Sequence, residues 1–333
     1  MSGLLVRWRP PFPVPCSRFT SIMPSLPRIA ITLGDPRGIG PEIAAKVLAE
    51  GIEADVTLIG AEDQIADLPA VRKIAVGNWD QGSGEGTGAA ERGRAARAGR
   101  IAGHGVETAA RLAIAKEVDA IVTAPAHKHA LRLAGFAYPG HTEWLAHLAG
   151  DVEVAMMLAA EELRVVLVTT HVPLRSVPEL VTTERVVRTG QIAAAALRDW
   201  WGIATPRLAV CALNPHAGEA GLFGDEDQRV LAPAARTLGA DGPLPADTVF
   251  VRAMRGEFDA VLAPYHDVGM TAIKVAAFGR GVNVTLGLPF PALLPITEPP
   301  WTSRAPAAPI PAVCGQRSNS PFISPANVSL HEV

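Results

Sequence analysis

The sequence predicts an α/β protein in which a mainly parallel β-sheet is covered by helices. Short apolar runs alternate with longer Ala-rich segments, which is the pattern of parallel strands joined by crossover helices. Apolar residues make up 48% of the 333 residues and aromatic residues only 5%, as suits a sheet that is buried on both faces. Three of the apolar runs end in a histidine, at the edge where open α/β sheets bind ligands.

Seven apolar runs are predicted to be strands because each is short and bounded by turn residues. They cover residues 28–33, 55–59, 120–123, 164–170, 208–213, 260–263 and 282–286. The segments predicted to be helices are 41–50, 89–116, 141–149, 183–200 and 228–238. Pro41 suits the first turn of its helix, where no N–H donor is needed. The glycine-rich stretch 82–88 lacks the Gly-Lys-Ser/Thr ending of a phosphate-binding loop and is predicted to be a surface loop.

The two ends of the chain differ in composition from the middle. Residues 1–27 contain six prolines and no acidic residue, and they lack the apolar core of a signal peptide. We interpret them as an irregular extension, with Met23 as a candidate for the true start. Residues 28–290 form the predicted α/β domain. Residues 291–333, with nine of the 29 prolines and no periodicity, are predicted to be an irregular tail.

Charge and cysteine content exclude several classes of protein. A net charge of −3, from 30 basic and 33 acidic residues, gives no electrostatic reason to expect nucleic-acid binding. No apolar stretch reaches the roughly 18 residues of a membrane span. The cysteines, Cys16, Cys211 and Cys314, are dispersed and odd in number. They indicate neither a disulfide framework nor a Cys-x-x-Cys site, and they favour a cytoplasmic protein.

The three histidines at predicted strand ends are His171, His216 and His266. Imidazole is a common ligand of divalent transition metals, and three protein nitrogens with one open position are typical of catalytic sites. For any one of these histidines alone, a role in capping the end of a strand is the favoured interpretation. The same placement three times favours one shared metal site.

A second cluster of polar residues opens a predicted helix. Tyr138-Pro-Gly-His141-Thr142-Glu143 puts His141 and Thr142 at the positive end of that helix, where an anion such as phosphate is stabilised. N-capping explains Thr142 as well as ligand binding does. The turn between Gly34 and Gly40 is not a Gly-x-Gly-x-x-Gly fingerprint, so the sequence does not predict a Rossmann dinucleotide site.

Together these motifs carry a family resemblance. Gly-Asp-Pro-x-Gly-Ile-Gly-Pro-Glu, Thr-Ala-Pro-x-x-Lys, Pro-Gly-His-Thr-Glu, Thr-Thr-His-Val-Pro-Leu, Leu-Asn-Pro-His-Ala-Gly-Glu and Pro-Tyr-His-Asp-x-Gly-Met occur in that order. They resemble the 4-hydroxythreonine-4-phosphate dehydrogenases of pyridoxal phosphate biosynthesis over residues 28–290. The resemblance implies an isocitrate/isopropylmalate dehydrogenase-like fold, with two α/β/α lobes around a central cleft.

The resemblance also implies a reaction. It is the NAD- or NADP-dependent oxidation of the 3-hydroxyl of 4-phosphooxy-L-threonine. The resulting 3-oxo acid then decarboxylates to 3-amino-2-oxopropyl phosphate. A divalent Zn, Mg or Co ion held by the three histidines takes part, and the third histidine comes from the other subunit of a homodimer. No residue can be assigned to the ribose 2′ position, so the choice between NAD and NADP stays open.

Further site residues follow from the matching motifs. The implied substrate-binding residues are His141, Thr142, Lys274 and Asn283. Lys274 suits a phosphate or carboxylate as a point charge, although it can also be a solvated surface lysine. Asp247 is a candidate acid–base or metal-supporting group, and helix capping explains it equally well. Asp267 can orient the adjacent histidine or bind the metal weakly.

The chain departs from the family after Phe290. Family members continue with Ile-Arg-Thr-Ser and then Asp-His-Gly-Thr-Ala, whereas this chain continues with Pro291-Ala-Leu-Leu-Pro295. The missing arginine is a substrate ligand in the family, and the missing loop approaches the dinucleotide. The ending resembles translation in a shifted reading frame, with a divergent natural tail as the alternative. The sequence therefore leaves two alternative functions open. The chain is either a related dehydrogenase that acts on a phosphorylated sugar acid, or an inactive remnant that binds a metal or ligand.

Overall fold

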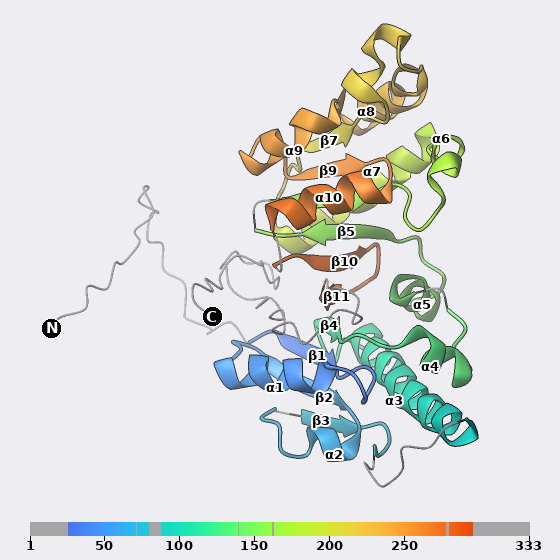
Figure 1. Cartoon of the computed structure of the whole chain (residues 1–333). Helices are drawn as coiled ribbons and strands as arrows, with labels where there is room; N and C mark the ends of the chain where they lie inside the picture. Colours follow the sequence, from blue (N-terminus) through green and yellow to red (C-terminus); the bar gives the residue numbers. More distant parts are fainter. Residues whose placement is uncertain are drawn as a thin grey trace, which may run out of the picture.

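The computed structural model describes residues 26–70, 72–79, 88–138, 140–161, 163–277 and 280–295. These residues form one eleven-stranded sheet along the length of the molecule, with helices packed against it (Figure 1). The strands are β1 (Arg28–Thr32), β2 (Asp55–Gly60), β3 (Arg72–Ala75), β4 (Ala120–Thr123), β5 (Ala155–Ala159), β6 (Arg164–Leu167), β7 (Leu208–Cys211), β8 (Asp241–Leu244), β9 (Ala260–Ala263), β10 (Val282–Leu286) and β11 (Ala292–Pro295).

The helices lie between these strands along the chain. The α-helices are α1 (Gly40–Glu50), α2 (Glu62–Ile65), α3 (Ala89–Ile114), α4 (Lys128–Leu133), α5 (His141–Leu148), α6 (Val177–Leu180), α7 (Thr183–Trp201), α8 (Ala232–Leu238), α9 (Ala246–Met254) and α10 (His266–Ala276). Two short 3-10 segments, η1 (Leu174–Ser176) and η2 (Pro215–Gly221), and one π-helical turn, η3 (Asp227–Leu231), complete the described helical structure. None of the described helices is long and apolar enough to cross a membrane.

The order of strands divides the sheet into two groups. The order is β3-β2-β1-β4-β11-β10-β5-β6-β9-β7-β8. The strands β1 to β4 form one parallel group, and β6 to β9 form a second parallel group. Between them, β5, β10 and β11 are joined by antiparallel pairing, while β11 runs parallel to β4. The sheet is therefore mixed.

Both faces of this sheet are buried under helices. Along β1, Ile29 and Ile31 belong to a core that spans one face, whereas Ala30 belongs to a core on the other face. The same alternation occurs in β7, where Val210 and Ala209 face different cores. Successive side chains of a strand point to opposite faces, so apolar residues at every position give the near-continuous runs seen in the sequence.

All seven predicted strands are present, and two of them are shorter than expected by two or three residues. The runs predicted over 164–170 and 208–213 end as strands at Leu167 and Cys211. Four further strands, β3, β5, β8 and β11, were not predicted. The residues of β3 are largely exposed, β5 contains no β-branched residue, and β8 contains both Gly and Pro. These strands are defined by pairing with neighbours rather than by their own propensity.

The prediction of a mainly parallel sheet is confirmed, and only the pairings among its central strands are antiparallel. β5 and β6 are separated by four residues, and the backbone N–H of Ala160 donates to the carbonyl of Leu163 at 2.9 Å. A connection this short can join only antiparallel strands, because a parallel pair needs a crossover of a dozen or more residues.

The prediction of an irregular tail from residue 291 is wrong for residues 292–295. Residues 292–295 form β11 in the middle of the sheet, paired with β4 on one side and β10 on the other. Ala292 is 0% exposed, and Leu293 is 7% exposed. Pairing on both sides satisfies the backbone of a segment whose two prolines argue against a strand. The remaining predicted tail, most of the 1–27 extension and most of the 82–88 loop lie outside the described residues.

Close packing of α3 on α4 gives a stability prediction. A Cβ atom at Gly99 would lie 1.9 Å from the carbonyl oxygen of Ala130. Gly99→Ala is therefore expected to lower the free energy of unfolding by roughly 2–4 kcal/mol. Gly93 lies on the same helix with nothing within 4 Å, so Gly93→Ala is expected to stabilise the protein by about 0.5–1 kcal/mol. Urea unfolding measures both, and equal effects would contradict the packing argument.

Candidate active site

Two of the predicted metal ligands lie side by side at the carboxyl edge of the sheet. β6 and β9 are parallel neighbours, with Val165 opposite Val261. His171 follows β6, and His266 begins α10 just after β9. Their ring centroids are 5.4 Å apart. Two imidazoles bound to one tetrahedral ion at about 2.0–2.1 Å have ring centres roughly 5 Å apart, so the spacing of this pair suits a shared ion.

The backbone around the pair is fixed by hydrogen bonds between the two strand ends. The backbone N–H of Val168 donates to the carbonyl of Ala263 at 2.9 Å. The hydroxyl of Thr169, which is 2% exposed, donates to the carbonyl of Pro264 at 2.8 Å. These bonds tie the segment before His171 to the segment before His266. The relative position of the two rings is therefore set by the sheet.

The surroundings of His171 favour its neutral imidazole. Desolvation lowers the pKa of His171, and the nearby His266 and Lys128 lower it further, whereas Glu143 raises it. Nδ1 of His266 lies 2.6 Å from Oδ1 of Asp267. A carboxylate in that position fixes the orientation of an imidazole and leaves Nε2 available. The structure thus shows the Asp267–His266 contact that the sequence suggested.

The third histidine is not part of this pair. His216 lies in η2 after β7, and its φ is +53°. Among the residues that the structure describes, no group of three or more His, Cys, Asp or Glu side chains could hold a metal ion. The sequence placed His266 on the other subunit, but the chain brings His266 next to its own His171 and leaves His216 apart.

The turn that carries His216 is strained and well anchored. Residues 216–220 all have positive φ, and four of the five are not glycine, an arrangement that costs about 1–2 kcal/mol per residue. The carboxylate of Asp227, which is 0% exposed, accepts hydrogen bonds from the backbone N–H groups of Leu213 and Asn214 and from the Asn214 amide. Strain that is held in this way is typical of functional turns.

The start of α5, which carries two of the predicted substrate residues, contacts β10, which carries a third. The hydroxyls of Thr142 and Thr285 are 3.3 Å apart. Asn283 lies two residues before Thr285 on β10, and therefore on the same face of the strand. Oδ1 of Asn283 and Nε2 of His141 are buried without a hydrogen-bond partner among the described residues. Buried polar atoms normally have partners, so these two suit the polar groups of a ligand.

The alternative interpretation of Thr142 as a helix cap is wrong. The N-cap residue of α5 is Gly140, and no side chain caps this helix. The Thr142 hydroxyl instead contacts Thr285, which is 143 residues away in the chain. Only the pairing of β10 into the centre of the sheet brings the two threonines together.

The imidazole of His141 is kept neutral by its position. Desolvation, together with the charge of Lys128, lowers its pKa to about 4. At neutral pH the ring therefore has one N–H donor and one acceptor nitrogen. A neutral ring can bind a hydroxyl or an anion without carrying a charge of its own.

This pKa predicts a pH-dependent stability. An unfolded histidine titrates near 6.5, so between about pH 6.5 and pH 4 the unfolded state binds more protons than the folded state. Stability is therefore lost as the pH falls through this window. From pH 7 to pH 4 the wild type should lose about 3 kcal/mol more than His141→Gln in urea unfolding. His129→Gln, at an exposed histidine, should keep the wild-type pH dependence, and parallel curves for wild type and His141→Gln would contradict the prediction.

Lys274 and Asp247 lie on helices at the surface. Lys274 is exposed in the last turn of α10, and Asp247 is exposed in the first turn of α9. The N-cap position of α9 is Pro245, and no side chain caps that helix. Capping by Asp247, the alternative interpretation from the sequence, is therefore not what the structure shows. In the described part of the chain neither side chain touches the histidine pair through a hydrogen bond or an ion pair.

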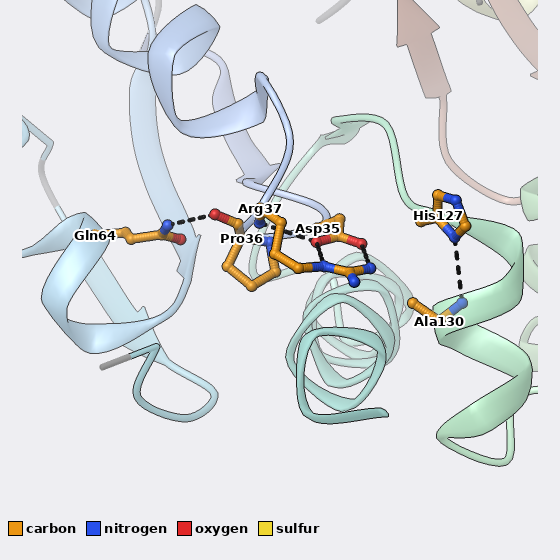
Figure 2. Close-up of polar contacts among 6 residues, drawn as sticks. All are labelled: Asp35, Pro36, Arg37, Gln64, His127 and Ala130. Atoms are coloured by element: carbon orange, nitrogen blue, oxygen red, sulfur yellow. Dashed lines mark hydrogen bonds and ion pairs between the residues drawn. The ribbon is translucent and has the colours of Figure 1, made fainter. Parts of the chain in front are cut away.

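The glycine-rich turn after β1 is a second, rigid turn, and it belongs to the other parallel group of strands (Figure 2). The carboxylate of Asp35, which is 4% exposed, binds Nε and Nη2 of Arg37 at 3.0 and 2.7 Å. Gln64 donates to the carbonyl of Pro36 at 2.8 Å. Gly34 has φ +68°, and a Cβ there would lie 2.3 Å from the carbonyl oxygen of Pro125, so only glycine allows this close approach.

The sequence motifs include two residues, His127 and Lys128, for which no role was predicted. Nδ1 of His127 accepts a hydrogen bond from the backbone N–H of Ala130 at 3.4 Å and caps α4 (Figure 2). Lys128 begins α4, and its charge lowers the pKa of both His141 and His171. The feature of the sequence that could have identified Lys128 as a site residue was its position in the Thr-Ala-Pro-x-x-Lys motif.

Polar side chains gathered at the ends of strands in a helix-covered sheet are typical of the active site of an α/β enzyme. Residues 43–295 match the family described as "Pyridoxal phosphate biosynthetic protein PdxA". The chain belongs to this family, as the resemblance of the motifs indicated. Its fold is isocitrate/isopropylmalate dehydrogenase-like, the fold of the solved family members.

Curated relatives and solved structures agree with this assignment. The chain is 43% identical over 297 residues to a 4-hydroxythreonine-4-phosphate dehydrogenase from Geobacter metallireducens, covering 79% of this chain and 85% of the relative. It is 42% identical over 291 residues to a D-threonate 4-phosphate dehydrogenase from Salmonella typhimurium, covering 79% and 88%. A 4-hydroxythreonine-4-phosphate dehydrogenase structure from Klebsiella pneumoniae matches with a TM-score of 0.71 and 38% identity, covering 80% and 90%. All three relatives are dehydrogenases by name, so the chain is of oxidoreductase type.

Proposed function

We propose that the site carries out the NAD(P)- and divalent-metal-dependent oxidation of 4-phosphooxy-L-threonine at its 3-hydroxyl. The 3-oxo acid formed by this oxidation is a β-keto acid, and it loses carbon dioxide to give 3-amino-2-oxopropyl phosphate. The observation that carries the proposal is the His171–His266 pair, with ring centroids 5.4 Å apart at the carboxyl edge of the sheet. The names of the relatives support the choice of substrate.

The residues present suit a divalent cation and an oxygen-rich substrate. His171 and His266 supply the borderline nitrogen donors that Zn and Co prefer. A bound cation would lower the pKa of the substrate hydroxyl and stabilise the developing alkoxide. Thr142 and Asn283 would orient the substrate through the Thr142 hydroxyl and the buried Asn283 amide. Lys274 is assigned to a charged end of the substrate and Asp247 to an acid–base role, both by motif.

A second candidate substrate is a phosphorylated sugar acid. The relative from Salmonella typhimurium, at 42% identity, is named for D-threonate 4-phosphate. That compound has a hydroxyl where 4-phosphooxy-threonine has an amino group, and the two compounds share the phosphate and the carboxylate. NAD(P)H formation should therefore be measured with both substrates, with and without added divalent metal. Metal-independent formation with either substrate would contradict the proposed chemistry.

We also propose that the site is completed in a homodimer. His171 and His266 are neighbours within one chain, so the ligand to be supplied by a second copy is His216. A two-fold dimer gives two equivalent sites that exchange this residue. This assembly revises the expectation that His266 is the residue that crosses between subunits.

Mixing inactive variants tests the assembly. Combining His171→Ala with His216→Ala chains should restore activity, because one of the two hybrid sites then has all three ligands. Combining His171→Ala with His266→Ala should restore none, because each site loses one ligand. Recovery in the second mixture but not the first would assign His266, rather than His216, to the partner. No recovery in any mixture after confirmed subunit exchange would place all three ligands in one chain.

A further inference from the structure

The turn that carries His216 follows β7, which is the last strand but one at its end of the sheet (Figure 1). His216 is exposed, and so are Leu222 and Phe223 beyond it. All five residues from 216 to 220 have positive φ, a conformation that is unfavourable for residues other than glycine. Such a conformation persists only where the surrounding structure holds it. The direction of the His216 side chain therefore depends on what anchors this turn.

A buried carboxylate anchors the start of the turn. Asp227 is fully buried, and its Oδ1 accepts a hydrogen bond from the backbone N–H of Leu213 at 2.8 Å. Its Oδ2 accepts from the backbone N–H of Asn214 at 3.0 Å and from the Asn214 side-chain amide at 2.9 Å. A buried carboxylate is costly unless its oxygens accept hydrogen bonds. Losing any of these donors would therefore be unfavourable, and the chain directly before Pro215 is fixed.

The charge of Asp227 is balanced by these N–H groups rather than by a basic side chain. The basic residue closest in sequence is Arg229, and its Nε lies 3.3 Å from Oδ2 of Asp225 instead. Across the described part of the chain, no Lys, Arg or His forms an ion pair with Asp227. An amide in place of the carboxylate has one oxygen that accepts and one NH₂ group that only donates. In Asp227→Asn, a donor would therefore face a backbone N–H on one of the two sides.

Asp227 is itself held in place by the core and by close packing of the loop. It begins the π-helical turn η3, which ends at Leu231, a buried core residue. A Cβ at Gly218 would lie 2.8 Å from the carbonyl oxygen of Gly224, and a Cβ at Gly224 would lie 2.8 Å from Nδ2 of Asn214. The two ends of this loop are thus packed against each other around the carboxylate.

Only one residue separates this anchor from His216. Pro215 lies between Asn214 and His216, and its ring fixes φ near −65°. The backbone N–H of Ala217 donates to the carbonyl of Asn214 at 3.2 Å, which closes the chain around Pro215 and His216. Few torsions are therefore free between the hydrogen bonds of the Asp227 carboxylate and the Cα of His216.

We propose that Asp227 is a positioning residue for the metal ligand His216. The inference rests on the proposed function, in which His216 completes the ion site. The Asp227 carboxylate does not bind the ion; it fixes Leu213 and Asn214. Through Pro215 this anchor sets the position from which the His216 imidazole reaches the ion. Without the carboxylate the turn could relax out of its positive-φ conformation, and ordering His216 again would oppose metal binding.

The test is a Co²⁺ titration of the full-length chain by calorimetry, without substrate or dinucleotide. Asp227→Asn is expected to weaken Co²⁺ binding by about 10- to 100-fold, as is usual when a residue that orients a metal ligand is changed. Asp259→Asn is the matched control. Asp259 also accepts a backbone N–H, from Arg207 at 2.7 Å, but it precedes β9 and so lies at the opposite edge of the sheet. Asp259→Asn should lower the melting temperature and leave the Co²⁺ affinity unchanged.

A double-mutant cycle distinguishes positioning from general destabilisation. If Asp227 acts on the ion only through His216, adding Asp227→Asn to His216→Ala should cause no further loss of affinity. A second variant, Pro215→Gly, changes an exposed residue and removes none of the groups that bind the Asp227 carboxylate. It frees the φ angle between Asn214 and His216. It should weaken Co²⁺ binding as well, and only in chains that contain His216.

The outcomes separate this inference from the proposed function. Wild-type Co²⁺ affinity in a folded Asp227→Asn chain, or an equal loss with and without His216, would overturn the positioning role. If Asp227→Asn does not fold, wild-type affinity in Pro215→Gly overturns it. Unchanged affinity in His216→Ala alone would refute the ligand set of the proposed function, and the role of Asp227 with it. Loss of affinity in His216→Ala but not in Asp227→Asn counts only against the role of Asp227.

Discussion

Alanine in place of His171, His216 or His266 is expected to lower metal-dependent turnover by about 1000-fold or more. Each substitution removes one ligand from the proposed ion, and the remaining imidazoles hold it too weakly to keep it in position. A bound cation contributes several kcal/mol of charge stabilisation, and each 1.36 kcal/mol corresponds to a tenfold change in rate. Turnover is measured as NAD(P)H formation, and bound metal is measured by elemental analysis after dialysis.

The fold should survive these substitutions. His171 is exposed and His266 is partly exposed, so neither ring fills a core position. The circular dichroism spectrum should therefore remain that of the wild type, and His129→Ala, at an exposed histidine on α4, should retain full turnover. The substitutions are made both in the natural chain and in a chain with a family-like ending. Near-normal turnover in all three single variants would contradict the shared metal site.

A family-like ending, Ile-Arg-Thr-Ser…Asp-His-Gly-Thr-Ala, placed after Phe290 is expected to raise dinucleotide affinity and turnover by about 100-fold. Counting from Phe290, the family arginine falls at Ala292. Ala292 lies opposite Thr285 on β10, and the Thr285 hydroxyl contacts Thr142. The side chain of an arginine at position 292 would therefore leave the sheet on the same face as the Thr285 hydroxyl, next to the predicted substrate residues. Charge-assisted bonds of about 1.5–3 kcal/mol correspond to roughly 10- to 100-fold in affinity.

Substrate binding and dinucleotide binding are separated by comparing Ala292→Arg alone with replacement of the whole segment after Phe290. Ala292→Arg alone should improve the KM for the phosphorylated substrate without changing the affinity for NAD or NADP. Only the full ending should improve dinucleotide binding, which calorimetry measures directly. Tight NAD(P) binding and normal turnover by the natural chain would contradict this prediction, together with the alternative that the chain is an inactive remnant.

Local sequence was sufficient where a segment carries its own structural signal. The runs at β1, β2, β4 and β9 contain Ile, Val or Leu at about half of their positions and Ala or Thr at most of the others, and they are bounded by turn residues. They were therefore predicted within one or two residues. The ends of α1 and α3 were likewise close to their predicted positions. The segment predicted as a helix over 228–238 begins with a π-helical turn before α8. Pro233 in the first turn of α8 cannot donate a backbone hydrogen bond.

Elements that depend on distant partners were not predictable. β5 lacks β-branched residues, and β11 is preceded by Pro291 and ends at Pro295. Each is nevertheless a central strand, because its backbone groups are satisfied by neighbours on both sides. Composition placed residues 291–295 in an irregular tail, whereas pairing with β4 and β10 puts β11 in the middle of the sheet.

The sequence by itself determined the class of fold, the family and the residues that end the strands. These follow from local patterns, since apolar runs define buried strands and motifs occur in a fixed order along the chain. Only the tertiary structure decided which of those residues meet. Because the order of strands is β6-β9-β7, His266 lies beside His171 while His216 lies one strand further along. The pairing of β10 in the centre of the sheet likewise gives Thr142 its contact with Thr285, since side chains far apart in the chain are brought together only by the register of the strands between them.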